Sequence, residues 1–206
     1  MAETLRDNLG SIFSYRDIRA LIDNLEPEYR RLFDEVCPGL ISVSGIMNIA
    51  KALLSERVSI RNLPLLLEAV AEVAAQSRRL EQIVEAVRMR LAPQMCGDAS
   101  DRGVLRVLKL GTRWDAIFSN CIKRDSKGEI IEFALDPVHI ESFGAEAALA
   151  LREHLGLGLP FVIVTAPEAR PFVRMLIARI NAAIPVFSHL EISRCRDIVA
   201  IGSIAQ

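Results

Sequence analysis

Apolar residues recur at spacings of three and four along most of the first half of the chain, which is typical of helices that bury one face. The clearest stretch begins after Asn62, whose side-chain oxygen can accept a backbone N–H of the first turn. Pro64 falls in that first turn, where a missing N–H costs nothing. The pattern predicts a capped helix whose core face carries Leu63, Leu66, Leu67, Val70 and either Val73 or Ala74.

Four other stretches of the first half show the same period and predict helices: 14–25, 27–37, 45–56 and 78–91. We expect Ser14 and either Ser42 or Ser44 to cap two of them. Pro93 and Gly97 are expected to end the last helix. The run Val58-Ser59-Ile60 favours a short extended segment. Residues 1–93 are therefore predicted to form a small helical, winged-helix-like domain.

The second half alternates strand-like and helix-like segments. Strands are predicted at 104–111, 129–135, 161–165, 185–188 and 197–204. Asp136-Pro137 should open a helix that reaches Leu155, and Thr165 to Glu168 has the spacing of a capping box for another. The fold class that follows is α+β, with an α/β ferredoxin-like sandwich over residues 104–206. The polar, glycine-containing segment 94–103 is the expected linker.

The distribution of charge distinguishes between nucleic acid and protein as partners of the helical half. The chain has 206 residues, 51% of them hydrophobic, with 25 basic and 26 acidic side chains and a net charge of −1. No run of Lys or Arg exceeds two residues, so the chain has no overall positive potential that would favour binding to nucleic acid. The helix after Asn62 carries Glu68 and Glu72 and no basic residue before Arg78, which argues against a DNA-reading helix. Protein contacts are the favoured use, and a DNA-binding winged helix is the alternative.

The four cysteines are Cys37, Cys96, Cys121 and Cys195, and no Cys-x-x-Cys occurs. We expect them to be small buried hydrophobes in a reducing compartment. The N-terminus has early acidic residues and does not resemble a signal peptide. The longest uncharged apolar stretch has 13 residues, whereas a membrane span needs about 20, so the chain is expected to be soluble.

Motifs for cofactor or metal chemistry are not found in the sequence. It has no Gly-x-Gly-x-x-Gly and no P-loop lysine motif. His139 and His154 lie on one predicted helix about four turns apart, too far to share a metal. Ser188, His189 and Asp197 are the nearest candidates for a hydrolase triad, but no Gly-x-Ser-x-Gly elbow accompanies them. A polar strand end is the favoured interpretation, and a hydrolase-like enzyme is the alternative.

Several segments in order resemble one protein family. They are "DEVCPGLISVSGIMNIAKALLSERV", "VSIRNLPLLLEAVAEVA" and "FVIVTAPEARPFVRMLIARI" followed by "IPVFSHLEI". The family is the large export-gate membrane protein of bacterial flagellar and virulence type III secretion systems. The segments "LKLGTRWD" and "IKRDSKGEIIEF" are most similar to the flagellar branch. Asn62 and Pro64 differ from the residues that are commoner in the family, but both are still compatible with a capped helix start.

The resemblance implies a protein-transport role without enzyme activity or cofactor. Family members carry an N-terminal membrane region and four cytoplasmic subdomains, and this chain corresponds to the third and fourth, with residues 1–13 as the tail of a preceding one. The cytoplasmic parts form a nine-membered ring at the cytoplasmic face of the inner membrane. That ring receives and orders export chaperone–substrate complexes and contacts other export-apparatus proteins. A membrane contact would come only through the N-terminal region, and no nucleic acid is implied.

Ring assembly directs attention to the turn before the Asn62 helix. Glu56, Arg57 and Arg61 are charges that the fold is not expected to need. We predict Arg57 and Arg61, with Glu68 and Glu72 behind them, as contacts between protomers. The alternative is that all four are ordinary solvated charges.

Overall fold

The computed structural model describes residues 9–77, 79–126 and 130–205. It divides into two compact units, one up to Met95 and one from Cys96 onward, here called the helical unit and the α/β unit. The boundary lies inside a continuous helix, α7. That the two units fold separately stays a prediction.

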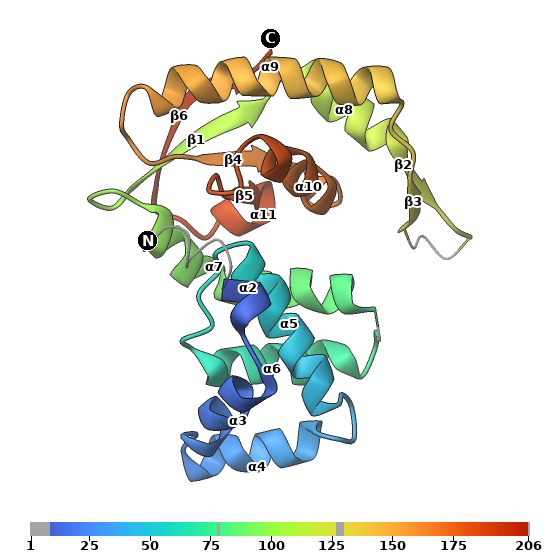
Figure 1. The fold of residues 1–206 in the computed structure, drawn as a ribbon, viewed down its shortest axis with the longest axis vertical. Helices are drawn as coiled ribbons and strands as arrows, with labels where there is room; N and C mark the ends of the chain where they lie inside the picture. The colour runs from blue at the N-terminus through green and yellow to red at the C-terminus, as the bar shows by residue number, and fades with distance from the viewer. Residues whose placement is uncertain (1–8, 78, 127–129, 206) are drawn as a thin grey trace. The chain divides into compact units, whose positions relative to one another are not determined.

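The helical unit contains six described helices, the last of which passes its boundary (Figure 1). They are α2 (Leu9–Ile12), α3 (Tyr15–Asp23), α4 (Pro27–Val36), α5 (Val43–Ser55), α6 (Leu63–Ala74) and α7 (Leu80–Ala99). The predicted caps are confirmed: Ser14, Ser42 and Asn62 each accept a backbone N–H of the helix that follows. Polar caps therefore begin three of the helices, as the sequence indicated.

The apolar faces of α5, α6 and α7 form the core of the helical unit. α6 packs against α4, and α5 packs against α2 and α3. The predicted core face of α6 is confirmed, because its leucines are buried and Leu66 and Leu67 are 0% exposed. The fully buried aliphatic side chains of these helices include Ile46, Ile49, Leu53, Leu66, Leu67, Val70, Val87 and Leu91.

The short strand predicted at residues 58–60 is wrong. No strand occurs among residues 9–77 and 79–95, so the described part of the unit has no β wing and the winged-helix-like prediction is not met. Val58 and Ile60 are buried all the same, at 5% and 8% exposure. The two β-branched residues fill the core from an irregular connection, because no second strand lies beside them to form a ladder.

The predicted end of the last helix is also wrong. α7 continues through Pro93 and ends at Ala99, so residues 94–99 of the predicted linker are helical. Leu91, Met95 and Cys96 are buried on this part of the helix. Their burial compensates for the single backbone hydrogen bond that a proline removes. The hydroxyl and the N–H of Ser100 then both donate to the Cys96 carbonyl at the helix end.

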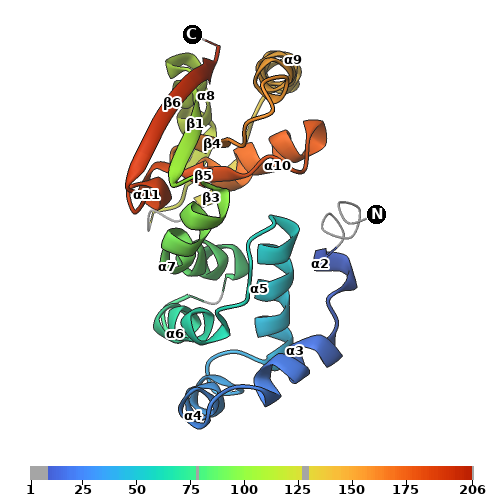
Figure 2. The ribbon, with the colours of Figure 1, turned by 90° about the vertical axis from the view of Figure 1, so that its left-hand side faces the viewer.

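A four-stranded parallel sheet organises the α/β unit. Its strand order is β5-β4-β1-β6, and every neighbouring pair is parallel. The strands are β1 (Val104–Leu110), β4 (Val162–Thr165), β5 (Val186–Ser188) and β6 (Asp197–Ile204). The helices are α8 (Thr112–Cys121), α9 (Pro137–Leu155), α10 (Arg170–Ile180) and α11 (His189–Ile192), with α9 and α10 on one side of the sheet in Figure 2.

The mixed helix and sheet class is confirmed, but the ferredoxin-like sandwich is wrong. A ferredoxin-like fold joins two neighbouring strands directly, β-α-β-β-α-β, whereas helices separate all four strands of this sheet. The predicted strand at 129–135 is present as β3 (Ile130–Phe133), but it pairs with β2 (Ile122–Arg124) in a separate antiparallel ribbon. The capping box at Thr165 is wrong too, because α10 begins at Arg170 after an N-cap residue, Ala169, that makes no side-chain cap.

An aromatic cluster packs α8 and α9 together. Trp114, Phe118 and Phe143 are all 0% exposed. The Phe143 ring meets Trp114 and Phe118 edge-on, with centroids 5.1 and 5.0 Å away. Edge-to-face pairs at this spacing stabilise a core beyond the area that they bury. α8, which sequence periodicity did not predict, is thus held in place by tertiary packing.

The cap and the core of α6 should contribute different amounts to stability. Asn62→Ala removes the acceptor of the Leu65 N–H, now 3.2 Å away, and should lower the free energy of unfolding by about 0.5–2 kcal/mol. Leu66→Ala leaves a cavity at a fully buried position and should cost about 2–5 kcal/mol. Urea midpoints of the two variants measure this; equal and negligible losses would contradict the placement of the helix.

Candidate functional site

The α5–α6 turn, residues 56–62, is the segment that the sequence singled out for contacts. α5 ends in a Schellman motif: the Val58 N–H donates to the Leu53 carbonyl at 2.9 Å, and the Arg57 N–H donates to the Leu54 carbonyl at 3.0 Å. Arg57 occupies the left-handed position of the motif with φ 60°. Glycine is the usual residue there because a side chain is disfavoured at positive φ. An arginine is thus kept at a position where the backbone favours glycine.

A buried ion pair fixes the start of this turn. The Arg88 guanidinium donates to the Glu56 carboxylate at 2.9 Å, and the two side chains are only 2% and 18% exposed. The expectation that the fold does not need Glu56 is therefore wrong. The carboxylate neutralises a cation that burial would otherwise penalise strongly.

A second contact fixes the middle of the turn. The Gln94 side-chain amide donates to the Ser59 carbonyl at 2.8 Å, and Val58 and Ile60 on either side are buried. This contact satisfies a carbonyl that has no strand partner. Because α7 supplies both Arg88 and Gln94, one helix holds the turn at two points.

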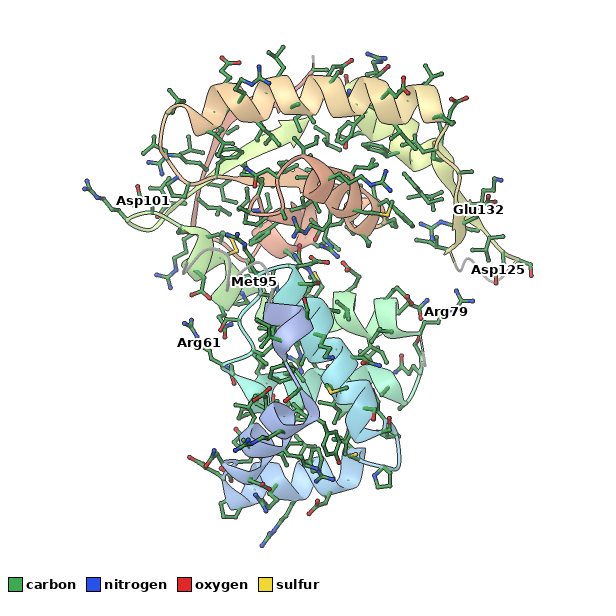
Figure 3. The ribbon with its side chains drawn as sticks, in the orientation of Figure 1. Arg61, Arg79, Met95, Asp101, Asp125 and Glu132 are labelled. Atoms are coloured by element: carbon green, nitrogen blue, oxygen red, sulfur yellow. A yellow bond between two sulfur atoms is a disulfide. The ribbon has the colours of Figure 1, made fainter. Side chains whose placement is uncertain are left out.

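Of the four predicted contact residues, Arg57 and Arg61 lie in the turn and Glu68 and Glu72 lie in α6. Arg57 is half-buried, while Arg61 is exposed and points outward from the helical unit in Figure 3. Glu68 and Glu72 follow on α6, four residues apart and hence on one helix face. About 15 Å of helix rise separates the level of Asn62 from that of Glu72. Glu72 already has a partner in the same chain, an exposed ion pair with Arg90.

The alternative hydrolase triad is not assembled. Ser188 is buried and caps α11: its hydroxyl accepts the Glu191 N–H at 3.2 Å, and the Glu191 carboxylate accepts the Ser188 N–H at 2.6 Å. His189 and Asp197 are exposed. Among the described residues no hydrogen bond joins His189 to Ser188 or to Asp197. The hydroxyl that would act as the nucleophile is committed to a helix cap.

Asp115 in α8 is an unusual carboxylate of the α/β unit. Its Oδ1 is buried without a hydrogen-bond partner in the part of the chain that the structure describes. Burial raises the pKa of this carboxyl above its ordinary value, and the charge of nearby His189 opposes that change. A desolvated carboxylate without a hydrogen-bond partner is a local cost to the fold.

The cysteine expectation is corrected for one pair. Cys96 and Cys195 form a disulfide in the α/β unit, so they are not both simple buried thiols. Cys37 and Cys121 are free, and burial raises the pKa of both thiols. Across residues 9–77, 79–126 and 130–205 no group of three His, Cys, Asp or Glu side chains could hold a metal ion. None of the helices in those ranges is long and apolar enough to cross a membrane.

Glu56 of the turn and Glu72 of α6 should differ sharply in their effect on stability. Glu56→Ala leaves the Arg88 charge buried without its carboxylate and should lower the free energy of unfolding by about 3–5 kcal/mol. Glu72→Ala breaks only an exposed pair and should cost less than about 1 kcal/mol. Denaturant unfolding of both variants is the measurement, and a similar small loss for both would show that the buried pair does not hold the turn.

Asp115 should make stability depend on pH in a defined direction. Because its pKa is higher in the folded chain than in the unfolded chain, its contribution is most favourable below about pH 4 and is lost as the pH rises through the folded pKa. Asp115→Asn should therefore gain stability over the wild type as the pH increases from 4 to 7. Thermal midpoints across that range test this prediction, with exposed Asp34→Asn as the control. A difference in midpoint between Asp115→Asn and the wild type that narrows as the pH rises would contradict it.

Comparisons with known proteins agree with this architecture. A model of the FHIPEP family matches residues 1–197. The flagellar biosynthesis protein FlhA of Caulobacter vibrioides is 30% identical over 205 residues, which are 99% of this chain and 29% of that protein. Protein MxiA of Shigella flexneri is 26% identical over 204 residues, again 99% of this chain and 29% of the relative. The chain thus spans less than a third of the length of these relatives.

Solved structures show the same fold. The structure of Shigella flexneri MxiA matches with a TM-score of 0.81 at 26% identity, covering 97% of this chain and 63% of that one. Chlamydia pneumoniae CdsV matches with a TM-score of 0.84 at 25% identity, covering 99% of this chain and 58% of that one. These matches confirm the resemblance to the flagellar and type III secretion export gate. Because the family model covers nearly the whole chain, the chain belongs to the FHIPEP family.

Proposed function

We propose that this chain is a ring-forming and protein-docking module of a bacterial flagellar or type III protein export gate, and that it acts without catalysis or a cofactor. The observation that carries the proposal is the family match over residues 1–197. FlhA, the relative with 30% identity, is named for flagellar biosynthesis, which supports the flagellar branch. The module works at the cytoplasmic face of the inner membrane, and a membrane region outside this chain anchors it.

Two structures of similar fold support ring formation. EPEC SctV-C, with a TM-score of 0.79 and 22% identity, is nonameric, and so is the EscV cytosolic domain, with a TM-score of 0.79 and 24% identity. A closed ring needs a heterologous contact between different patches at a fixed angle. The patch must therefore be rigid, and we propose that it includes the α5–α6 turn of this chain.

The anchoring of the turn supports its place in the interface. The Glu56–Arg88 pair and the Gln94 contact hold its backbone from α7, so Arg61 projects from a stable base. Arg57 retains a side chain at a left-handed position, which costs conformational energy that a glycine would avoid. Strain of this kind concentrates at functional sites. We assign Arg57 and Arg61, with Glu68 and Glu72 behind them, to the contact between protomers.

Charges at such a contact set orientation and the rate of association more than they set affinity. An isolated copy of the module can then remain monomeric at low concentration and assemble when the membrane region holds many copies together. The partners proposed beyond other copies are export chaperone–substrate complexes and other export-apparatus proteins. A structure of Chlamydia pneumoniae CdsV with CdsO, at 24% identity to this chain, supports a partner of the second kind.

Reversing one charge on the turn should impair assembly without unfolding the module. In the full-length, membrane-anchored protein, Arg61→Glu should reduce ring assembly and export by about tenfold, because like charges meeting across a contact suppress association. The thermal midpoint of the 206-residue chain should stay nearly unchanged, since Arg61 is exposed. Arg31→Glu, an equal reversal at another exposed arginine of the helical unit, is the matched control.

Crosslinking of assembled rings and secretion of an export substrate are the two readouts. Loss in Arg61→Glu together with wild-type behaviour of Arg31→Glu is the expected result. Normal assembly and export in Arg61→Glu would remove the turn from the interface. Equal loss in both variants would show that net charge matters rather than the turn.

A further inference from the structure

Cys96 and Cys195 occupy two ends of the α/β unit along the sequence. Cys96 is the first residue of that unit and lies in the last turns of α7, while Cys195 lies between α11 and β6. The disulfide between them spans a sequence separation of 99 residues. It therefore encloses almost the whole α/β unit in one covalent loop.

The bond also anchors an edge strand of the sheet. β6 is an edge strand, hydrogen-bonded only to β1, and most of its residues are exposed. Cys195 precedes its first residue, Asp197, by two positions. Fastening Cys195 to α7 therefore adds a covalent anchor at the N-terminal end of the edge strand, where its pairing with β1 begins at Asp197.

The same site also accommodates the reduced pair. The Cys96 sulfur lies 3.7 Å from the Glu191 carbonyl oxygen, within reach of an S–H donor. Glu191 is 1% exposed and is held by the capping box with Ser188, so the acceptor stays in place when the disulfide opens. A reduced Cys96 is thus buried with a hydrogen-bond partner rather than unsatisfied.

The two cysteine residues differ in exposure, which indicates the order of the exchange. Cys96 is 4% exposed, whereas Cys195 is half-buried. A small thiol or disulfide reagent therefore reaches the Cys195 sulfur first, and the Cys96 thiolate completes the exchange from inside. The other cysteines, Cys37 and Cys121, are unpaired.

We propose that Cys96 and Cys195 form a redox-responsive staple of the α/β unit, open under reducing conditions and closed by thiol–disulfide exchange. Glutathione disulfide is the class of oxidant. One Cys195–glutathione mixed disulfide forms and releases one glutathione, and then Cys96 displaces the second. The two cysteine thiols lose two electrons and two protons, and one glutathione disulfide becomes two glutathione thiols. In a reducing compartment the staple is open until disulfide stress closes it.

The test compares the oxidised and reduced 206-residue chain. After equilibration with glutathione disulfide, thiol titration in denaturant should find two free thiols, Cys37 and Cys121; after dithiothreitol it should find all four cysteines of the sequence. Reduction should lower the thermal midpoint by on the order of 10 °C, because the bond closes a long loop. Hydrogen exchange of residues 96–103 and 193–200 should be faster in the reduced chain.

Matched variants separate the staple from general effects of redox reagents. Cys195→Ser and Cys195→Ala should show no redox dependence of the midpoint, and Cys121→Ser should keep all of it. A peptide map of the oxidised chain should join Cys96 to Cys195. Four free thiols after oxidation, a different cysteine pair, or an unchanged redox shift in both Cys195 variants would overturn the proposal.

Discussion

The buried guanidinium of Arg88 constrains the described part of the helical unit, because the apolar helices there must accommodate its buried charge. A charge with 2% exposure needs a carboxylate, and Glu56 supplies it from the end of α5. That requirement sets where α5 must stop, and the Schellman motif then reverses the chain through Arg57. This ion pair therefore helps to fix the positions of the turn that follows and of the start of α6 at Asn62.

The consequence is a surface whose exposed charges stand on a rigid frame. α7 contributes both Arg88 and Gln94 to the turn, while its apolar side chains fill the core. If the residues that we propose as contacts are placed in this way, their backbone loses little conformational entropy on association, which favours specific docking. The protein-docking role that we propose for this chain would need such a frame.

In the α/β unit, polar residues at the ends of two parallel strands are buried. The carboxyl ends of parallel strands are where many enzymes bind ligands. Here Ser188 caps α11 at the end of β5, and its partner Glu191 is buried in the same capping box. Thr165, at the end of β4, is 0% exposed. The last residues of β4 and β5, Thr165 and Ser188, are thus both buried.

Local sequence signals determined the elements that depend on neighbours a few residues away. The caps at Ser14, Ser42 and Asn62 and the leucine face of α6 follow from rules of capping and periodicity, and all are confirmed. The helix opened by Asp136-Pro137 and the strands predicted at 104–111, 161–165 and 197–204 rest on the same rules, and they are present as α9, β1, β4 and β6. The family was also readable from sequence, because ordered segments resemble it along nearly the whole chain.

Only the tertiary structure decided the features that join distant residues. Glu56 and Arg88 are 32 residues apart, and Cys96 and Cys195 are separated by 99 residues. No local sequence pattern therefore predicts either pair. The parallel pairing of β1 with β4 and β6 is likewise long-range, and the alternation of strands and helices alone did not exclude a ferredoxin-like order. α7 runs through Pro93 because buried side chains on both sides of the proline compensate for one lost hydrogen bond. The chain's local propensities set what each segment can be, and burial of side chains brought together from distant positions decided which possibility is realised.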